Sequence, residues 1–148
     1  MGGENRFVLL AEQYVARVLE QGNIAVCVHI YINGLLHYGM RYGEGRKKDL
    51  TKYITGYIRD TFKDVLVTRL SDDRFVMMAH DDEMELAIAI LNQHINKDFR
   101  DSGIIISAGG CRIKSLEDRS RIAEAMKRAE EVCHEIVLDD EMHYRVDG

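Results

Sequence analysis

The chain has 148 residues, of which 46% are hydrophobic and 30% charged, and its formal net charge is −5. This composition indicates one globular domain with a single core, and it excludes disordered and fibrous chains. The negative charge argues against nucleic-acid binding, which needs surplus Lys and Arg to displace counterions. Since no apolar run approaches the roughly 20 residues that span a bilayer, the sequence also predicts no membrane contact.

The first half of the chain predicts helices around one buried strand. Phe7–Leu19 has apolar residues at helical spacing. Ile24–Ile32 is a nearly continuous β-branched run, which is typical of a central strand covered on both faces. Leu35–Gly45 is rich in glycine and predicts a short helix and then a loop, and Lys47–Phe62 carries the apolar stripe of an amphipathic helix.

The second half predicts a hairpin, then a helix, a strand and a final helix. These are, in order, strands Val65–Leu70 and Arg74–Ala79 around an acidic turn, helix Glu83–Ile95, strand Gly103–Ile113 and helix Ser115–Cys133, with Ser115 or Asp118 as its N-cap. The whole order predicts an α+β fold with a ferredoxin-like βαββαβ core, an antiparallel sheet flanked by helices on one face or both.

The domain is expected to cover residues 5–138. Residues 1–4 are interpreted as an expression remnant or a disordered start, and residues 139–148 as an unanchored polar tail or a linker to a following domain. The start lacks the basic and then apolar order of a signal peptide. An odd number of cysteines in apolar stretches predicts reduced, buried thiols and a cytoplasmic location; these are Cys27, Cys111 and Cys133.

The predicted hairpin carries a recognisable pattern. Its segment Arg69–Val76 resembles the Arg-Leu-Gly-Gly-Asp-Glu-Phe signature of GGDEF diguanylate cyclases, and five further segments resemble the family in the same order. The signature turn is Ser71, Asp72, Asp73, Arg74 and Phe75; the other segments are Asn5–Phe7, Ile24–Ile32, Leu50, Ser107–Gly110 and Ala129–His134. The resemblance implies a nucleotidyl cyclase-like fold and a role in bacterial cyclic di-GMP signalling, with Mg²⁺ and GTP as the family's cofactor and substrate.

The resemblance also implies that the catalytic site is degenerate. In the family, an Asp at the end of the first strand and an acidic signature residue hold Mg²⁺, which prefers carboxylate oxygens. Here His29 occupies the first Asp position, with Cys27 as the alternative, and Tyr31 occupies the second. Neither imidazole nor thiol is a good Mg²⁺ ligand, so we expect no catalytic residue and no metal site, with Asp73 as a vestigial metal position or a plain turn former.

Other family positions are replaced as well. Ser71 and Asp72 stand in place of two glycines, and Asp72 adds a negative charge where a triphosphate would lie. Arg74 reverses the charge of a glutamate. The guanine-contacting positions fall near His37 and Arg46, a phosphate-contacting lysine falls at Val137, and the inhibitory Arg-x-x-Asp site falls at Phe62 and Val65. For His29 beside Cys27, a soft-metal site is the alternative to a buried core histidine, which is favoured.

These replacements favour a catalytically inactive GGDEF-like domain that acts as a regulatory or interaction module, which implies no enzyme activity. The alternative is a nucleotide-sensing domain that controls an attached EAL phosphodiesterase, with Arg74, Arg46 and Lys47 on the phosphates. Residues 139–142 resemble the segment that joins GGDEF to EAL domains, and the family's reaction implies a homodimer. An active cyclase with unusual metal ligands and an unrelated ferredoxin-like binding module complete the alternatives.

Overall fold

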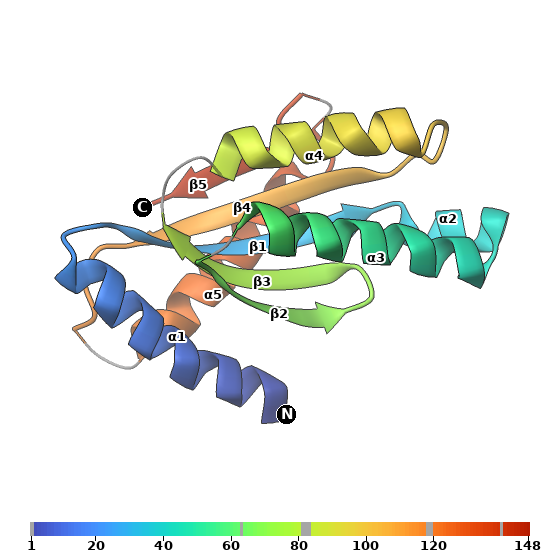
Figure 1. Ribbon diagram of the computed structural model, residues 1–148. Helices are drawn as coiled ribbons and strands as arrows, with labels where there is room; N and C mark the ends of the chain where they lie inside the picture. The colour runs from blue at the N-terminus through green and yellow to red at the C-terminus, as the bar shows by residue number, and fades with distance from the viewer. Residues whose placement is uncertain (1, 63, 81–83, 118–119, 140) are drawn as a thin grey trace.

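The computed structural model describes residues 2–62, 64–80, 84–117, 120–139 and 141–148. Ten elements follow one another along the chain (Figure 1): α1 (Gly2–Glu20), β1 (Ala25–Asn33), α2 (Leu35–Tyr42), α3 (Glu44–Thr61), β2 (Leu66–Ser71), β3 (Arg74–His80), α4 (Met84–Asp98), β4 (Ile105–Ile113), α5 (Ser120–Ile136) and β5 (Tyr144–Asp147).

The sheet has five strands in the order β2-β3-β1-β4-β5. Strand β1 lies at its centre and is antiparallel to both β3 and β4, and β2 is antiparallel to β3. This arrangement confirms the predicted ferredoxin-like βαββαβ core. Strand β5 extends the sheet in parallel to β4.

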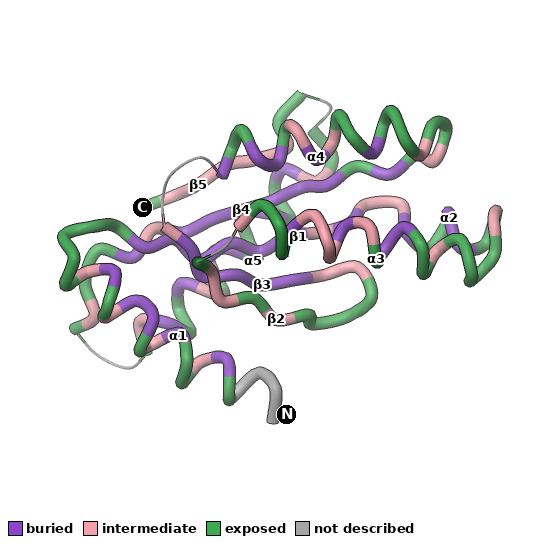
Figure 2. Tube along the Cα trace, viewed as in Figure 1, coloured by how far each residue is buried: buried purple, intermediate pink, exposed green. Residues whose placement is uncertain are grey.

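Alternating residues of β1 belong to two separate cores, because successive side chains of a strand point to opposite faces. Val28 and Ile30 pack in a cluster with residues of α2, α3 and α4. Ala25 and Cys27 pack in a second cluster with residues of α1 and α5. Both faces of the sheet are therefore covered, and β1 and β4 are buried along most of their length (Figure 2). All three cysteines are free and buried, as predicted.

The packing of α5 depends on one glycine. A Cβ atom added at Gly109 would lie 2.1 Å from the backbone nitrogen of Cys133 and 2.7 Å from the carbonyl oxygen of Ala129. Since these are backbone atoms of α5, a side chain at this position would push the helix away from β4. The glycine thus permits α5 to lie directly on the sheet, next to His29, which pairs with Gly109 in the β-ladder.

Several boundaries differ from the predicted ones. Helix α1 begins at Gly2, and α3 begins at Glu44, so the predicted loop before Lys47 is absent there. Helix α5 runs from Ser120 to Ile136, three residues beyond the predicted end; the cap candidate Asp118 and the helix residue Glu83 lie outside the described residues.

The prediction of an unanchored tail was wrong. Residues 144–147 form β5, and Tyr144 and Val146 pack against the cluster beneath α3 and α4. The side chain of Asp147 pairs with both Arg128 and Arg145. A four-residue strand with two apolar side chains needs this tertiary partner to form, which sequence periodicity does not show.

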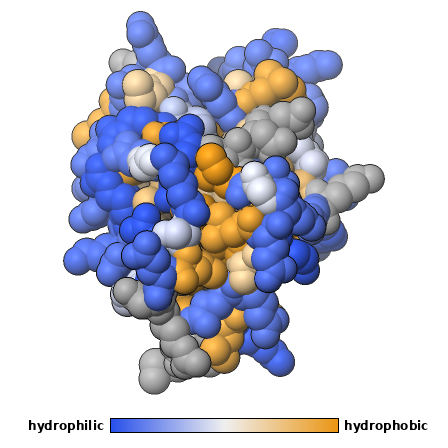
Figure 3. Space-filling view, turned by 90° about the vertical axis from the view of Figure 1, so that its left-hand side faces the viewer, coloured by the Kyte–Doolittle hydropathy of each residue, from blue (hydrophilic) through white to orange (hydrophobic). Residues whose placement is uncertain are grey.

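On the face drawn in Figure 3, hydrophilic residues surround a central band of hydrophobic ones. Among the described residues, no helix combines the length and the apolar content that crossing a membrane requires.

Candidate functional site

The hairpin between β2 and β3 has the form that the sequence predicts. Ser71 pairs with Arg74, and Asp72 and Asp73 form the turn between them. Arg69 donates from Nε to the Ser71 carbonyl oxygen (3.0 Å) and from Nη2 to the Asp72 carbonyl oxygen (2.9 Å). The hydroxyl of Ser71 donates to Oδ1 of Asp73 at 2.9 Å. The turn is therefore held by its own side chains.

The turn does not need the glycines that the family signature has. Among the described non-glycine residues, Asp101 alone has a positive φ, so Asp72 and Asp73 adopt ordinary backbone angles. The β2–β3 ladder shifts register between Arg69 and Ser71, and this irregularity lies directly before the turn. The tight hairpin therefore forms with Ser71 and Asp72 at its tip, without glycine.

The hairpin lies against the end of β1. The backbone amide of Ile32 donates to the Asp73 carbonyl oxygen at 2.8 Å, and Tyr31 pairs with Arg74. Nη1 of Arg74 lies 3.1 Å from Nε2 of His29. The guanidinium carbon of Arg74 lies 4.4 Å from the centre of the Tyr31 ring, within cation–π range. Three of the sequence-predicted residues therefore form one cluster of His29, Tyr31 and Arg74.

His29 is neutral in this cluster. An arginine side chain has hydrogen-bond donors and no acceptor, so Nε2 of His29 must accept and the imidazole proton must sit on Nδ1. The residue is 2% exposed. Its burial lowers the pKa, and the positive charge of Arg74 lowers it further, while Glu130 raises it. These effects agree with the direction of the hydrogen bond.

The donor set at this position does not fit Mg²⁺. The lone pair of His29 that could bind a cation accepts from Arg74, which brings its own positive charge to within 3.1 Å of that nitrogen. Asp73 supplies one carboxylate, which already accepts from Ser71. Cys27, the alternative first position, is fully buried, and burial raises the pKa of its thiol. Across the described residues, no three His, Cys, Asp or Glu side chains are grouped so as to hold a metal ion.

The other predicted positions lie apart from this cluster. His37 on α2 and Arg46 on α3 are both exposed, and the guanidinium of Arg46 lies 5.1 Å from the ring centre of Tyr42. Lys47 pairs with Asp72 at 3.5 Å and with Glu44 at 4.0 Å. Three cations were expected to contact nucleotide phosphates: Arg74, Arg46 and Lys47. They have different neighbours, so the structure does not bring them together in one cluster.

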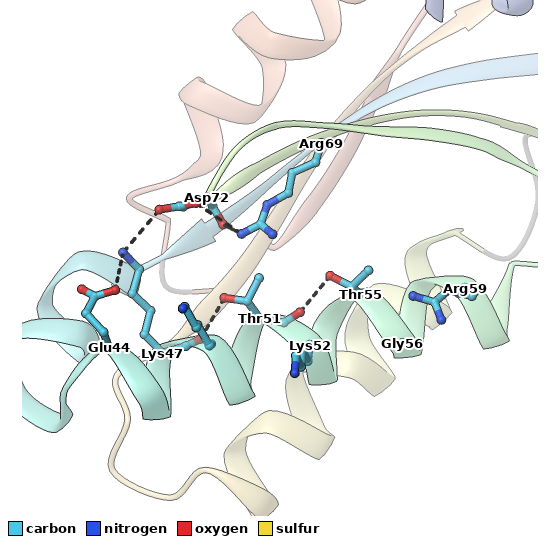
Figure 4. A pocket seen from close by; sticks show the side chains of 10 residues that line it. Glu44, Lys47, Thr51, Lys52, Thr55, Gly56, Arg59, Arg69 and Asp72 are labelled. Carbon is cyan, nitrogen blue, oxygen red and sulfur yellow. Dashed lines mark hydrogen bonds and ion pairs between the residues drawn. The ribbon is translucent and has the colours of Figure 1, made fainter. Parts of the chain in front are cut away.

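Sequence reasoning missed a groove beside the hairpin. It has a volume of about 640 Å³ and lies between α3 and the end of β2 (Figure 4). Its lining is mostly cationic and polar: Glu44, Lys47, Lys48, Thr51, Lys52, Thr55, Gly56, Arg59, Arg69 and Asp72. The lysines at positions 48 and 52 share one face of α3, which is a signal that helical spacing provides. The approach of Arg69 from β2 is a tertiary effect.

Solved structures with this architecture are GGDEF domains. The active GGEEF domain of a diguanylate cyclase from Vibrio cholerae has a TM-score of 0.78 at 12% identity, covering 96% of this chain and 94% of that one. The FimX GGDEF domain from Pseudomonas aeruginosa has a TM-score of 0.74 at 14% identity, covering 97% and 92%. The GGDEF domain of DgcB from Caulobacter crescentus, solved in complex with c-di-GMP, has a TM-score of 0.69 at 15% identity, covering 95% and 85%.

No protein-family model matches the chain, and no curated protein matches it. The similarity therefore lies in the arrangement of the elements rather than in the identity of the residues. The chain therefore has the fold of GGDEF domains.

Proposed function

We propose that this domain is a catalytically inactive GGDEF-like domain that acts as a regulatory or interaction module in bacterial cyclic di-GMP signalling. The observation that carries the proposal is the contact of Arg74 with His29 and Tyr31. It supports loss of catalysis because the resemblance assigns His29 to a metal-binding Asp position of the family, and a guanidinium lies against this histidine.

Diguanylate synthesis is a phosphoryl transfer, in which metal ions position the phosphates and neutralise their developing charge. A guanidinium could offset part of that charge, but the face of Arg74 lies on Tyr31 and one of its nitrogens donates to His29. Breaking both contacts would leave the buried imidazole without its hydrogen-bond donor. The cluster therefore favours the arrangement in which Arg74 contacts His29 and Tyr31 over one in which this position holds two metal ions.

The charge of Asp72 contributes less to this argument than the sequence suggests. Its carboxylate pairs with Lys47 at 3.5 Å and with Arg69 at 3.6 Å, and it is largely exposed. These partners offset its repulsion of a triphosphate. The lack of metal ligands at the end of β1 is thus a stronger reason than the charge of Asp72 to propose an inactive domain.

The test is a cyclase assay. The purified domain is incubated with GTP and Mg²⁺, and the products are separated by chromatography; the active Vibrio cholerae domain is the positive control. We expect no cyclic di-GMP above a protein-free blank. Product that accumulates in proportion to the amount of this domain would refute the proposal.

The alternative, a nucleotide-sensing domain that controls an attached EAL phosphodiesterase, has one supporting observation. The groove along α3 is rich in cations, although two of the three cations that were expected to bind phosphates lie elsewhere. An EAL/GGDEF domain protein from M. capsulatus is among the similar structures, at 17% identity and a TM-score of 0.60, covering 92% of each chain. Calorimetry with GTP, GDP and cyclic di-GMP tests this alternative, and saturable heat with any of them would favour it.

A cytoplasmic location, a homodimer and an EAL domain in the full-length protein belong to the same proposal. The homodimer and the EAL domain follow from the resemblance to the family, and the cytoplasmic location follows from the three cysteines in apolar stretches. Light scattering of the purified domain gives its oligomeric state directly, and a monomer at micromolar concentration would remove the dimer from the proposal.

A further inference from the structure

The groove along α3 continues beyond the part drawn in Figure 4. A second pocket of about 370 Å³ shares Thr55, Arg59 and Arg69 with the first, so the two adjoin. We call the combined feature the α3 groove. It lies between one face of α3 and the edge strand β2, and its second part is lined largely by apolar residues: Ile58, Phe62, Val65, Val67 and Phe75.

The first part of the α3 groove concentrates positive charge in a chain whose net charge is −5. It has five cationic side chains against the two carboxylates of Glu44 and Asp72. Both carboxylates pair with Lys47, and Asp72 also pairs with Arg69. Within the described residues, the other three cations form no ion pair: Lys48, Lys52 and Arg59. This part of the groove therefore suits an anionic partner.

Gly56 leaves the backbone of α3 uncovered in the lining of the groove. It lies in the interior of α3, where glycine weakens a helix, yet its φ is not positive and a Cβ there would meet nothing within 4 Å. Neither backbone geometry nor packing within the domain explains the glycine. Its position in the groove lining leaves the helix backbone open to a partner.

The length of the groove favours a polymer over a single nucleotide. Its lining on α3 and just beyond runs from Glu44 to Phe62, which is about 27 Å at the rise of an α-helix. An extended peptide of about eight residues spans the same distance. The neighbouring strand β2 is at the edge of the sheet, and an edge strand is a template for an added extended segment.

We propose that the α3 groove docks an extended, acidic segment of a partner protein. Carboxylates of the segment pair with Lys48, Lys52 and Arg59, and an apolar side chain enters the pocket beside Phe62 and Val67. This inference rests on the proposed role as an interaction module and gives that role a partner class. It does not depend on the state of the His29 cluster, because His29, Tyr31 and Arg74 do not line the groove.

The test uses defined probes and three variants. The probes are two fluorescein-labelled octapeptides, each made of four glutamates and four alternating leucine and valine residues. The glutamates come first in one peptide and last in the other. The control peptides have glutamine in place of each glutamate. The variant Lys48→Glu/Lys52→Glu reverses the unpaired charges, and Gly56→Gln fills the groove without a change of charge. Lys97→Glu/Lys114→Glu is the matched control, because both lysines are exposed and neither lines the groove.

At low salt, we expect the acidic peptide to bind and the glutamine peptide to bind about tenfold more weakly or not at all. The charge-reversal variant and Gly56→Gln should each weaken binding of the acidic peptide about tenfold, whereas the control should change it less than twofold. Gly56→Gln should not lower Tm, because it removes a glycine from a helix, so its loss of binding cannot be attributed to unfolding.

Three results would overturn the inference: no binding of the acidic peptides, binding that both groove variants leave unchanged, or a groove that takes GTP or cyclic di-GMP and excludes the peptide. Self-association of the domain that Gly56→Gln abolishes would also overturn it, because the occupant would then be a second copy. The cyclase assay keeps the two proposals separate, because peptide binding can fail in a domain that makes no cyclic di-GMP.

Discussion

Nη1 of Arg74 donates to Nε2 of His29 across 3.1 Å, from the first residue of β3 to the middle of β1. The two residues are not paired in the ladder, since Arg74 pairs with Tyr31 and His29 with Val76. The long arginine side chain therefore reaches diagonally along the strands and crosses the Tyr31 ring on the way. One side chain of the hairpin thus contacts the central strand of the sheet.

Removal of the guanidinium should change the titration of His29. In Arg74→Met, we expect the pKa of His29 to rise, because a positive charge that disfavours the imidazolium is gone and Glu130, which raises this pKa, remains. Burial still opposes protonation, so the pKa should stay below 6.5. NMR titration of the imidazole signals measures this, and Arg69→Met is the control. An unchanged His29 titration in Arg74→Met would contradict the contact.

The same histidine makes stability depend on pH. Because its pKa is lowered in the folded domain, the unfolded chain takes up a proton near pH 6.5 while the folded domain does not. Stability from this residue is therefore complete well above pH 6.5 and is lost as the pH falls toward the lowered pKa. When the pH is lowered from about 7.5 to about 5.5, we expect the Tm of His29→Gln to fall less than the Tm of the unsubstituted domain. Equal losses would show that His29 is not held neutral.

Gly109 should tolerate no side chain. Gly109→Ala places a Cβ against backbone atoms of α5 and should destabilise the domain by about 3 kcal/mol or more. Gly110→Ala is the matched control. Its Cβ would lie 3.1 and 3.2 Å from methyl carbons of Val26 and Val146 and 3.4 Å from the Cys27 carbonyl oxygen, so these neighbours need to move by only a few tenths of an ångström, and a cost of about 1 kcal/mol is expected. Urea unfolding measures both, and equal effects would mean that α5 does not lie as close to β4 as described.

The anchoring of β5 should depend on Asp147. Hydrogen bonding from Arg128 lowers the pKa of Asp147, and Arg145 adds to the effect. This carboxylate therefore stabilises β5 above pH 3.8 and stops doing so as the pH falls through its lowered pKa. We expect Asp147→Asn to speed amide hydrogen exchange in residues 144–147 at neutral pH, while Asp49→Asn, an exposed change on α3, leaves it unaltered. Equal exchange in the two variants would argue against this anchor.

The sequence predicts the core of the fold because its signals are local. The β-branched run at residues 24–32 indicates a buried strand, and Ser71–Asp73 indicates a tight turn; both are where the pattern places them. The sequence also names His29, Tyr31 and Arg74 as site residues. Their mutual contact depends on the register of β1 against β3, which periodicity does not fix.

The α3 groove and β5 are less visible in the sequence for the same reason. Arg69 comes to line the same groove as the face of α3 only after β2 is placed next to that helix. Tyr144 and Val146 form a strand because β4 offers them an open edge. Features that require two distant segments to meet leave little trace in either segment alone.

We expect the end of β1 and the turn at residues 71–74 not to bind divalent metal. To test this, the ¹⁵N-labelled domain is titrated with Mn²⁺ in the presence of a non-hydrolysable GTP analogue, and paramagnetic broadening is followed. No selective broadening is expected at His29, Tyr31 and Asp73 compared with the rest of the domain. Saturable broadening centred on these three residues would contradict this expectation.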